Sequence, residues 1–92
     1  MAIRPYKGIT PSLGAGVYVD PQAAVIGDVG IGADSSIWPM CSLRGDVNHI
    51  RIGERTSIQD GSVIHVTHKH AARAQGHATL VGSDVTVGHK VI

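Results

Sequence analysis

Aliphatic residues recur at every sixth position through most of this chain. The first run comprises Leu13, Val19, Val25, Ile31, Ile37 and Leu43. The same period resumes after three inserted residues at Ile52, Ile58 and Ile64, and after eleven more at Val81 and Val87. Neither the 3.6-residue period of a helix nor the two-residue alternation of a strand produces this spacing.

A second series of residues follows four positions after each aliphatic residue. Its members are Val17, Ala23, Val29, Ser35, Cys41, Val47, Thr56, Ser62, His68, Val85 and Val91, all small or β-branched except His68. Two such series at a six-residue period predict an all-β fold, a parallel β-helix in which three hexapeptides complete one triangular coil. A β-sandwich with Gly-rich turns has a similar composition, but it does not hold one phase over eleven units.

The composition agrees with a narrow, regular interior. Hydrophobic residues make up 42% of the 92 residues, yet aromatic residues make up only 3% and Phe is missing. A compact core of this size normally contains large rings. The length indicates one domain, and we expect an N-terminal extension over residues 1–12 and the β-helix over 13–92, truncated at its C-terminal end.

Charge and cysteine content exclude several classes of protein. The formal net charge is +1 with no block of like charge, which disfavours nucleic acid or a membrane surface as a partner. The segment "MAIRPYKGITPS" has no apolar run typical of a signal peptide, and one cysteine, Cys41, cannot form an internal disulfide. We therefore expect a cytoplasmic protein.

The repeat also predicts which side chains are neighbours in adjacent coils. Arg44 follows Leu43 and His65 follows Ile64, three units later, so Arg44 and His65 should lie in one column; Trp38 and Gln59 should share another. Strands in adjacent coils are about 4.8 Å apart, close enough for imidazoles to converge on one zinc ion. His65, a residue at position 94 and His89 of a neighbouring rod would supply three ligands, but position 94 lies beyond Ile92.

Simpler interpretations of the same residues remain open. His68, His70 and His77 lie in the long insertion at 67–79 and are expected to face solvent, although His68 could line a pocket. His49 is expected to be structural or solvated. Arg44 and Asp46 could form an ordinary surface ion pair. Cys41 is expected to be a small core residue, and Trp38 could cover a contact between subunits.

Two segments resemble a known family. "IWPMCSLRGDVNHIRIGERTSIQDGSVIHVTH" and the later "VGSDVTVGHKVI" are similar to the gamma-class carbonic anhydrase-like family of hexapeptide-repeat proteins, and the resemblance covers the chain from Arg4 to Ile92. It implies a left-handed β-helix that forms a homotrimer, with the chain corresponding to the N-terminal half only. It also implies reversible hydration of carbon dioxide to bicarbonate, a lyase reaction, by a zinc-bound hydroxide at the trimer interfaces, with iron or cobalt as other candidate metals.

The resemblance assigns roles to individual residues. His65 and His89 would be metal ligands, and the third ligand would stand at position 94. Gln59 would hydrogen-bond the metal-bound water, and Arg44 and Asp46 would link subunits and order the site. Asp60 matches a further inter-subunit polar residue. Some family members have acidic residues near the pocket that help to move protons. The corresponding residues of this chain are Val47 and His68, so His68 is the candidate proton shuttle.

Two other functions are consistent with the sequence. A hexapeptide-repeat acyltransferase would use a histidine as general base with acetyl-coenzyme A. A non-catalytic trimeric scaffold would retain the rod without a working site. Dependence of the activity on a metal distinguishes a carbonic anhydrase from an acyltransferase. Retention of a metal after purification distinguishes it from a non-catalytic scaffold.

Overall fold

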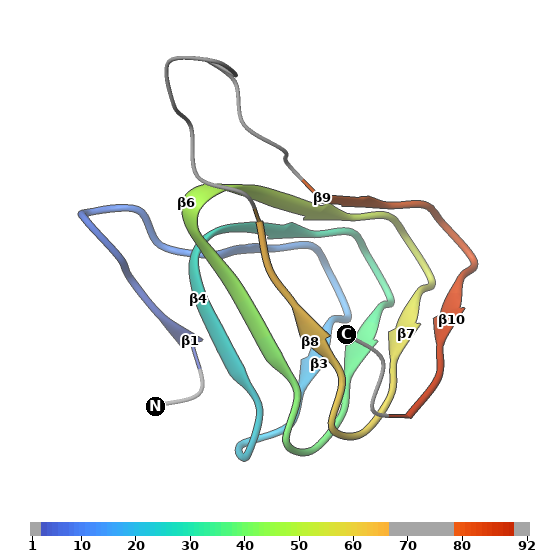
Figure 1. Cartoon of the computed structure of the whole chain (residues 1–92). Helices are drawn as coiled ribbons and strands as arrows, with labels where there is room; N and C mark the ends of the chain where they lie inside the picture. Colours follow the sequence, from blue (N-terminus) through green and yellow to red (C-terminus); the bar gives the residue numbers. More distant parts are fainter. Residues whose placement is uncertain (1–2, 67–78, 90–92) are drawn as a thin grey trace, which may run out of the picture.

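The chain winds into a rod with three faces, drawn in Figure 1. The computed structural model describes residues 3–66 and 79–89, which form ten strands. In chain order they are β1 (Ile3–Arg4), β2 (Ser12–Leu13), β3 (Tyr18–Val19), β4 (Ala24–Ile31), β5 (Ser36–Ile37), β6 (Ser42–Ile52), β7 (Ser57–Ile58), β8 (Val63–Ile64), β9 (Thr79–Val81) and β10 (Thr86–Val87). All the strand pairs are parallel, which confirms the predicted β-helix.

Each face of the rod stacks one aliphatic residue per coil. On the face that β4, β6 and β8 share, Val25 pairs with Leu43 and Leu43 with Ile64. The second face aligns Leu13, Ile31, Ile52 and Val81, and the third aligns Val19, Ile37, Ile58 and Val87. These are the columns that the six-residue period predicts, and the central coils bury them almost completely.

The small inward residues do more than fill space. Ser35 donates through Oγ to the carbonyl of Gly53 in the next coil (2.8 Å) and accepts from the Thr56 N–H (3.0 Å). Thr56 in turn donates through Oγ1 to the carbonyl of Gly82, again one coil on (2.7 Å). Buried polar groups need such partners. The inward hydroxyls therefore join successive coils where the strands end.

β4 and β6 are long because each turns a corner of the rod without leaving the sheet (Figure 1). Gly27 and Gly45 are paired at this corner, and Gly27 has a φ of 80°. A Cβ on Gly27 would lie 2.4 Å from the carbonyl oxygen of Gly45, closer than any side chain allows. Only glycine permits both the conformation and the close stacking.

The three-residue insertion forms a bulge directly after this corner. The register passes from Gly27–Gly45 to Val29–Ile50, so residues 46–49 of β6 lie opposite the single residue Asp28 of β4. Ile50 is completely buried at the core position, whereas Val47 is only partly buried. The assignment of Val47 to the inward column was therefore wrong. Ile50 takes that position because the extra residues loop out before it.

The N-terminal residues also take part in the sheet. β1 pairs with β4 through Ile3 and Val25, although it lies within residues 1–12. Residues Tyr6 and Ile9 form a small antiparallel bridge between β1 and β2. Over residues 3–66 and 79–89 there is no helix long and apolar enough to cross a membrane.

Candidate metal centre

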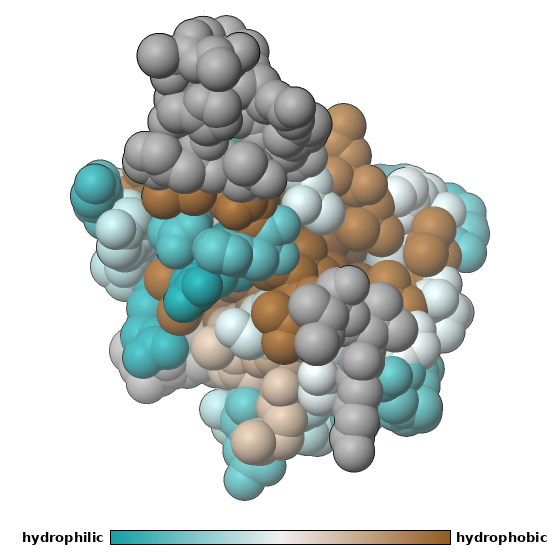
Figure 2. Space-filling view, viewed as in Figure 1, coloured by the Kyte–Doolittle hydropathy of each residue, from teal (hydrophilic) through white to brown (hydrophobic). Residues whose placement is uncertain are grey.

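Three polar side chains meet on the outer surface of the first face. Leu43 and Ile64 are paired in β6 and β8, so the residues that follow them, Arg44 and His65, project outward in neighbouring coils as predicted. Asp46 joins them from the start of the bulge. Its Oδ1 lies 3.0 Å from His65 Nε2, and its Oδ2 lies 3.3 Å from Arg44 Nε. Figure 2 shows hydrophilic side chains gathered over this part of the rod.

The environment of Asp46 favours its ionised form. Partial burial raises the pKa of Asp46, but the N–H of Val47, the hydrogen bond to His65 and the charge of His65 lower it by more, so the net pKa lies below the ordinary value. The side chain is only 18% exposed, against 52% for Arg44 and 40% for His65. Asp46 is therefore a carboxylate held between two more exposed partners.

The bulge explains why Asp46 faces His65 while its counterpart one coil earlier does not. Gly27-Asp28 and Gly45-Asp46 are equivalent pairs in β4 and β6. Asp28 instead binds Arg51, with Nη1 and Oδ1 2.9 Å apart. The spacing links Asp46 to Arg44 but does not predict its contact with His65. The repeated Gly-Asp pair directly before the insertion was the available signal.

Gln59 belongs to a second polar group, on the third face. Trp38 and Gln59 lie in adjacent coils, as predicted, because Ile37 pairs with Ile58. The indole Nε1 of Trp38 donates to Ser36 Oγ (2.9 Å) and Ser57 Oγ (3.1 Å), and Gln59 Nε2 donates to Ser57 Oγ (3.4 Å). Spacing alone did not predict the part that Ser57 plays between Trp38 and Gln59.

His89 lies at the corner that follows the third face. Its Nδ1 is 3.9 Å from Oδ1 of Asp60, which follows Gln59 one coil earlier, and both side chains are well exposed. The pairing of Val87 with Ile58 sets this alignment. His89 and Asp60 therefore flank the same corner as Gln59, and both lie at the surface of the rod.

The candidate ligands do not gather into one group within a single rod. Within the described residues, no group of three His, Cys, Asp or Glu side chains could hold a metal ion. His65 nevertheless has the surroundings typical of a ligand, since Asp46 holds Nε2 and leaves Nδ1 to bind a metal. His68, His70 and His77 lie outside the described residues, so their predicted positions are not tested.

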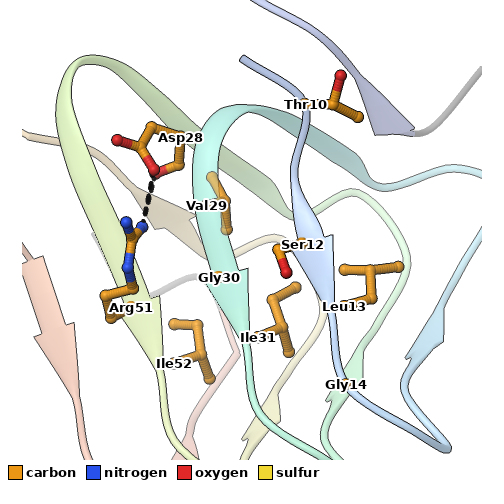
Figure 3. Close-up of a pocket in the computed structure, with 10 residues that line it drawn as sticks. All are labelled: Thr10, Ser12, Leu13, Gly14, Asp28, Val29, Gly30, Ile31, Arg51 and Ile52. Carbon is orange, nitrogen blue, oxygen red and sulfur yellow. Dashed lines mark hydrogen bonds and ion pairs between the residues drawn. The ribbon is translucent and has the colours of Figure 1, made fainter.

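The structure has a surface hollow that is separate from these residues. It has a volume of about 480 Å³ and is lined by Thr10, Ser12, Leu13, Gly14, Asp28, Val29, Gly30, Ile31, Arg51 and Ile52. Figure 3 shows the Arg51–Asp28 ion pair along one side, with Gly30 between β2 and β6. None of the candidate metal ligands or their polar partners lines it.

The structure also places three other residues singled out in the sequence, and it confirms the expectation for Cys41. Cys41 is 2% exposed and its thiol contacts the carbonyl of Gln59 at 3.0 Å, so it is a core residue. Trp38 is 38% exposed on the surface of the rod. His49 is half-buried in the bulge, and its N–H is bonded to the Asn48 side chain.

Comparison with known proteins places the chain among hexapeptide-repeat proteins. No protein-family model matches it. It is 49% identical over 90 residues to protein YrdA of Escherichia coli, covering 98% of this chain and 49% of that protein. It is also 49% identical over 75 residues to gamma carbonic anhydrase 1, mitochondrial, of Arabidopsis thaliana, covering 82% of this chain and 27% of that protein.

A solved structure supports the same assignment. A hexapeptide transferase family protein from Anaplasma phagocytophilum has 39% identity and a TM-score of 0.83, covering 97% of this chain and 48% of that one. This similarity confirms the left-handed β-helix. The chain spans about half the length of the E. coli relative. By sequence and by fold, the chain belongs to the gamma-class carbonic anhydrase-like family of hexapeptide-repeat proteins.

Proposed function

We propose that this chain is part of a gamma-type carbonic anhydrase-like metalloprotein that hydrates carbon dioxide reversibly at sites between the subunits of a homotrimer. The observation that supports this most directly is the Arg44–Asp46–His65 group, in which a carboxylate holds one nitrogen of an exposed imidazole and leaves the other available. This is the usual arrangement behind a metal-binding histidine. Zinc is the proposed metal, with iron or cobalt as alternatives.

The site draws on more than one subunit in this proposal. His65 supplies one ligand, His89 of a neighbouring subunit supplies a second, and the third stands at position 94, beyond the present chain. The exposure of the His89 side chain, 67%, is consistent with a ligand offered to a neighbour. A single rod holds no complete ligand set within the described residues, which agrees with a site between subunits.

The residues of this chain have distinct tasks in the proposed reaction. His65 and His89 would hold the zinc ion, and when bound the ion would lower the pKa of a water molecule to about 7 and so supply hydroxide at neutral pH. Asp46 holds the ring of His65 in one orientation, and Arg44 balances the charge of that carboxylate. Gln59 orients the water through its side-chain amide, and His68 moves the released proton toward solvent, since imidazole titrates near neutral pH.

Metal analysis and carbon dioxide hydration test this function together. The whole protein, which includes the ligand at position 94, should retain zinc on purification and hydrate carbon dioxide, and its His65→Ala variant should lose both. His49→Ala is the matched histidine control and should retain both, because His49 has no role in the proposed site. Full activity and metal content in His65→Ala would reject the assignment, and chelator-insensitive, acetyl-coenzyme-A-dependent transfer would favour an acyltransferase instead.

A further inference from the structure

The third face of the rod links an exposed tryptophan to Gln59 through one hydroxyl group. Trp38 follows Ile37 and Gln59 follows Ile58, and these two aliphatic residues are paired in adjacent coils. The backbone N–H of Trp38 donates to the carbonyl of Ile58 at 3.0 Å. Trp38 and Gln59 are therefore anchored by the same ladder of hydrogen bonds, and their side chains leave the same surface.

Ser57 bridges the two side chains. An indole N–H can only donate, so Ser57 Oγ acts as the acceptor for Trp38 Nε1, at 3.1 Å. The same oxygen accepts from Gln59 Nε2 at 3.4 Å. The amide nitrogen of Gln59 is thereby directed toward Ser57, and its oxygen Oε1 is left to accept a hydrogen bond from a molecule at the site.

The indole ring is itself held in place. Its Nε1 also donates to Ser36 Oγ, at 2.9 Å. The ring of Tyr18 packs beside it, with centroids 5.2 Å apart and planes inclined at 45°, a favourable arrangement for two aromatic rings. Tyr18 is in turn tied to Asp20 through its hydroxyl group (3.0 Å). The tryptophan is therefore a fixed point from which a flexible glutamine can be oriented.

We propose that Trp38 is a positioning residue that acts through the Ser57 hydroxyl to orient the Gln59 amide, so that Gln59 presents Oε1 as a hydrogen-bond acceptor to water at the metal centre. This rests on the proposed function for its catalytic consequence, but the coupling between the side chains exists without metal or substrate. A glutamine free to rotate its amide would present donor and acceptor alternately. When the amide is held in one orientation, Oε1 faces the water molecule all the time.

A spectroscopic test needs neither metal nor turnover. Trp38 is the only tryptophan in the chain, so its indole N–H gives a single signal in a ¹H–¹⁵N spectrum. Both Ser57→Ala and Gln59→Leu should move this signal by more than its line width. Ser12→Ala, which removes a hydroxyl group from another face, should leave it in place. An indole signal that does not respond to Gln59→Leu overturns the proposal.

A kinetic test measures the consequence in the zinc-loaded protein. Trp38→Phe keeps a ring but loses the N–H, and it should lower kcat for carbon dioxide hydration roughly three- to tenfold, about the value of one hydrogen bond, with KM nearly unchanged. Ser57→Ala should do the same, and the double variant should be no slower than Ser57→Ala alone. Ser12→Ala, on the exposed surface of β2 and on another face, should retain the parent activity.

The two tests separate failure of the positioning role from failure of the proposed reaction. Additive losses in the double variant, with an unresponsive indole signal, overturn the positioning role while leaving carbonic anhydrase activity in place. A protein that binds zinc but does not hydrate carbon dioxide rejects the reaction. In that protein, an indole signal that responds to zinc in the parent but not in Ser57→Ala still supports the Trp38–Ser57–Gln59 chain.

Discussion

Inward hydroxyl groups are the residue-scale feature that distinguishes this core from a purely aliphatic one. The spacing predicts small side chains at positions such as Ser35 and Thr56 because the interior is narrow. It does not predict what their hydroxyl groups bind, because the partners are backbone carbonyls of another coil, at Gly53 and Gly82. The small size of these side chains could be predicted from the sequence, whereas their hydrogen-bond partners could be identified only from the register of the coils.

Removing one of these hydroxyl groups should be costly. Ser35→Ala leaves both the Gly53 carbonyl and the Thr56 N–H without their partner in a buried position, so we expect the free energy of unfolding to fall by about 1–3 kcal/mol. Ser12→Ala, on the outer surface of β2, should change it by less than about 0.5 kcal/mol. Urea denaturation followed by circular dichroism measures both. Equal effects would show that the interior bonds contribute nothing beyond packing.

Asp46 should give the protein a specific sensitivity to acid. Its folded pKa lies below the unfolded value of about 3.9, so its ionised form stabilises the fold above that value, and the contribution is lost as pH falls through the folded pKa. Asp46→Asn should therefore reduce the free energy of unfolding at pH 7 by about 1 kcal/mol, and the difference should shrink below pH 4.

The control for the pH dependence of Asp46→Asn is a substitution of an exposed carboxylate. Glu54→Gln removes a side chain that is 57% exposed and weakly paired with Arg55, and surface pairs of this kind contribute little. We expect its stability to follow the parent protein from pH 7 to pH 3. A difference between Asp46→Asn and the parent that stays constant over this range would contradict the lowered pKa of Asp46.

At the scale of elements, the sequence predicted the columns of the rod but not the course of the bulge. The period restarts at Ile52 whichever residues loop out, and both Val47 and Ile50 are apolar and β-branched. Spacing therefore could not decide which of them faces inward. The register after the corner decides it, because Val29 pairs with Ile50 once residues 46–49 have looped out opposite Asp28.

Alanine substitutions at two glycines with the same φ distinguish the cost of backbone strain from the cost of steric crowding. Gly27 and Gly8 both have a φ of 80°, but a Cβ on Gly8 would have nothing within 4 Å, whereas a Cβ on Gly27 would collide with the backbone of Gly45. Gly8→Ala should cost about 1 kcal/mol through strain alone, and Gly27→Ala should cost at least about 2 kcal/mol more. Thermal or urea unfolding gives the two values, and equal losses would argue against crowding between β4 and β6.

Deleting Val47, Asn48 and His49 tests whether the bulge serves the site and not the fold. Gly45-Asp46 would then continue directly into Ile50, matching Gly27-Asp28-Val29 in the coil before. We expect the deletion variant to keep its β circular dichroism spectrum, because the flanking columns are unchanged. It should lose zinc affinity, because Asp46 would follow the course of Asp28 away from His65. Unchanged zinc affinity, measured by calorimetry, would show that the bulge does not direct Asp46.

At the scale of the whole molecule, the sequence predicted which coils carry the candidate ligands but not the directions of their side chains. The period alone placed His65 in one column with Arg44, and Gln59 in another with Trp38. That the described residues of a single rod contain no three-ligand group depends on side-chain directions, which spacing does not give. Assembly is therefore the level at which the proposed metal centre must be tested.

Mixing two inactive variants tests whether ligands come from different chains. If His65 and His89 of neighbouring subunits share a metal, co-refolding His65→Ala with His89→Ala should restore about one intact site in each mixed trimer, since one interface then combines both native histidines. Zinc content and activity should recover only in the mixture. No recovery, in a mixture shown by mass spectrometry to contain mixed trimers, would place the two histidines in separate sites.

The hydroxyl bonds between coils have a consequence for how such a rod can change its size. Each inward Ser or Thr needs a carbonyl supplied one full turn later, so adding or removing a few residues within a strand breaks donors and acceptors on every face at once. Residues can be inserted freely only where they loop out at a corner. Growth or shortening of the rod itself should therefore proceed in complete turns.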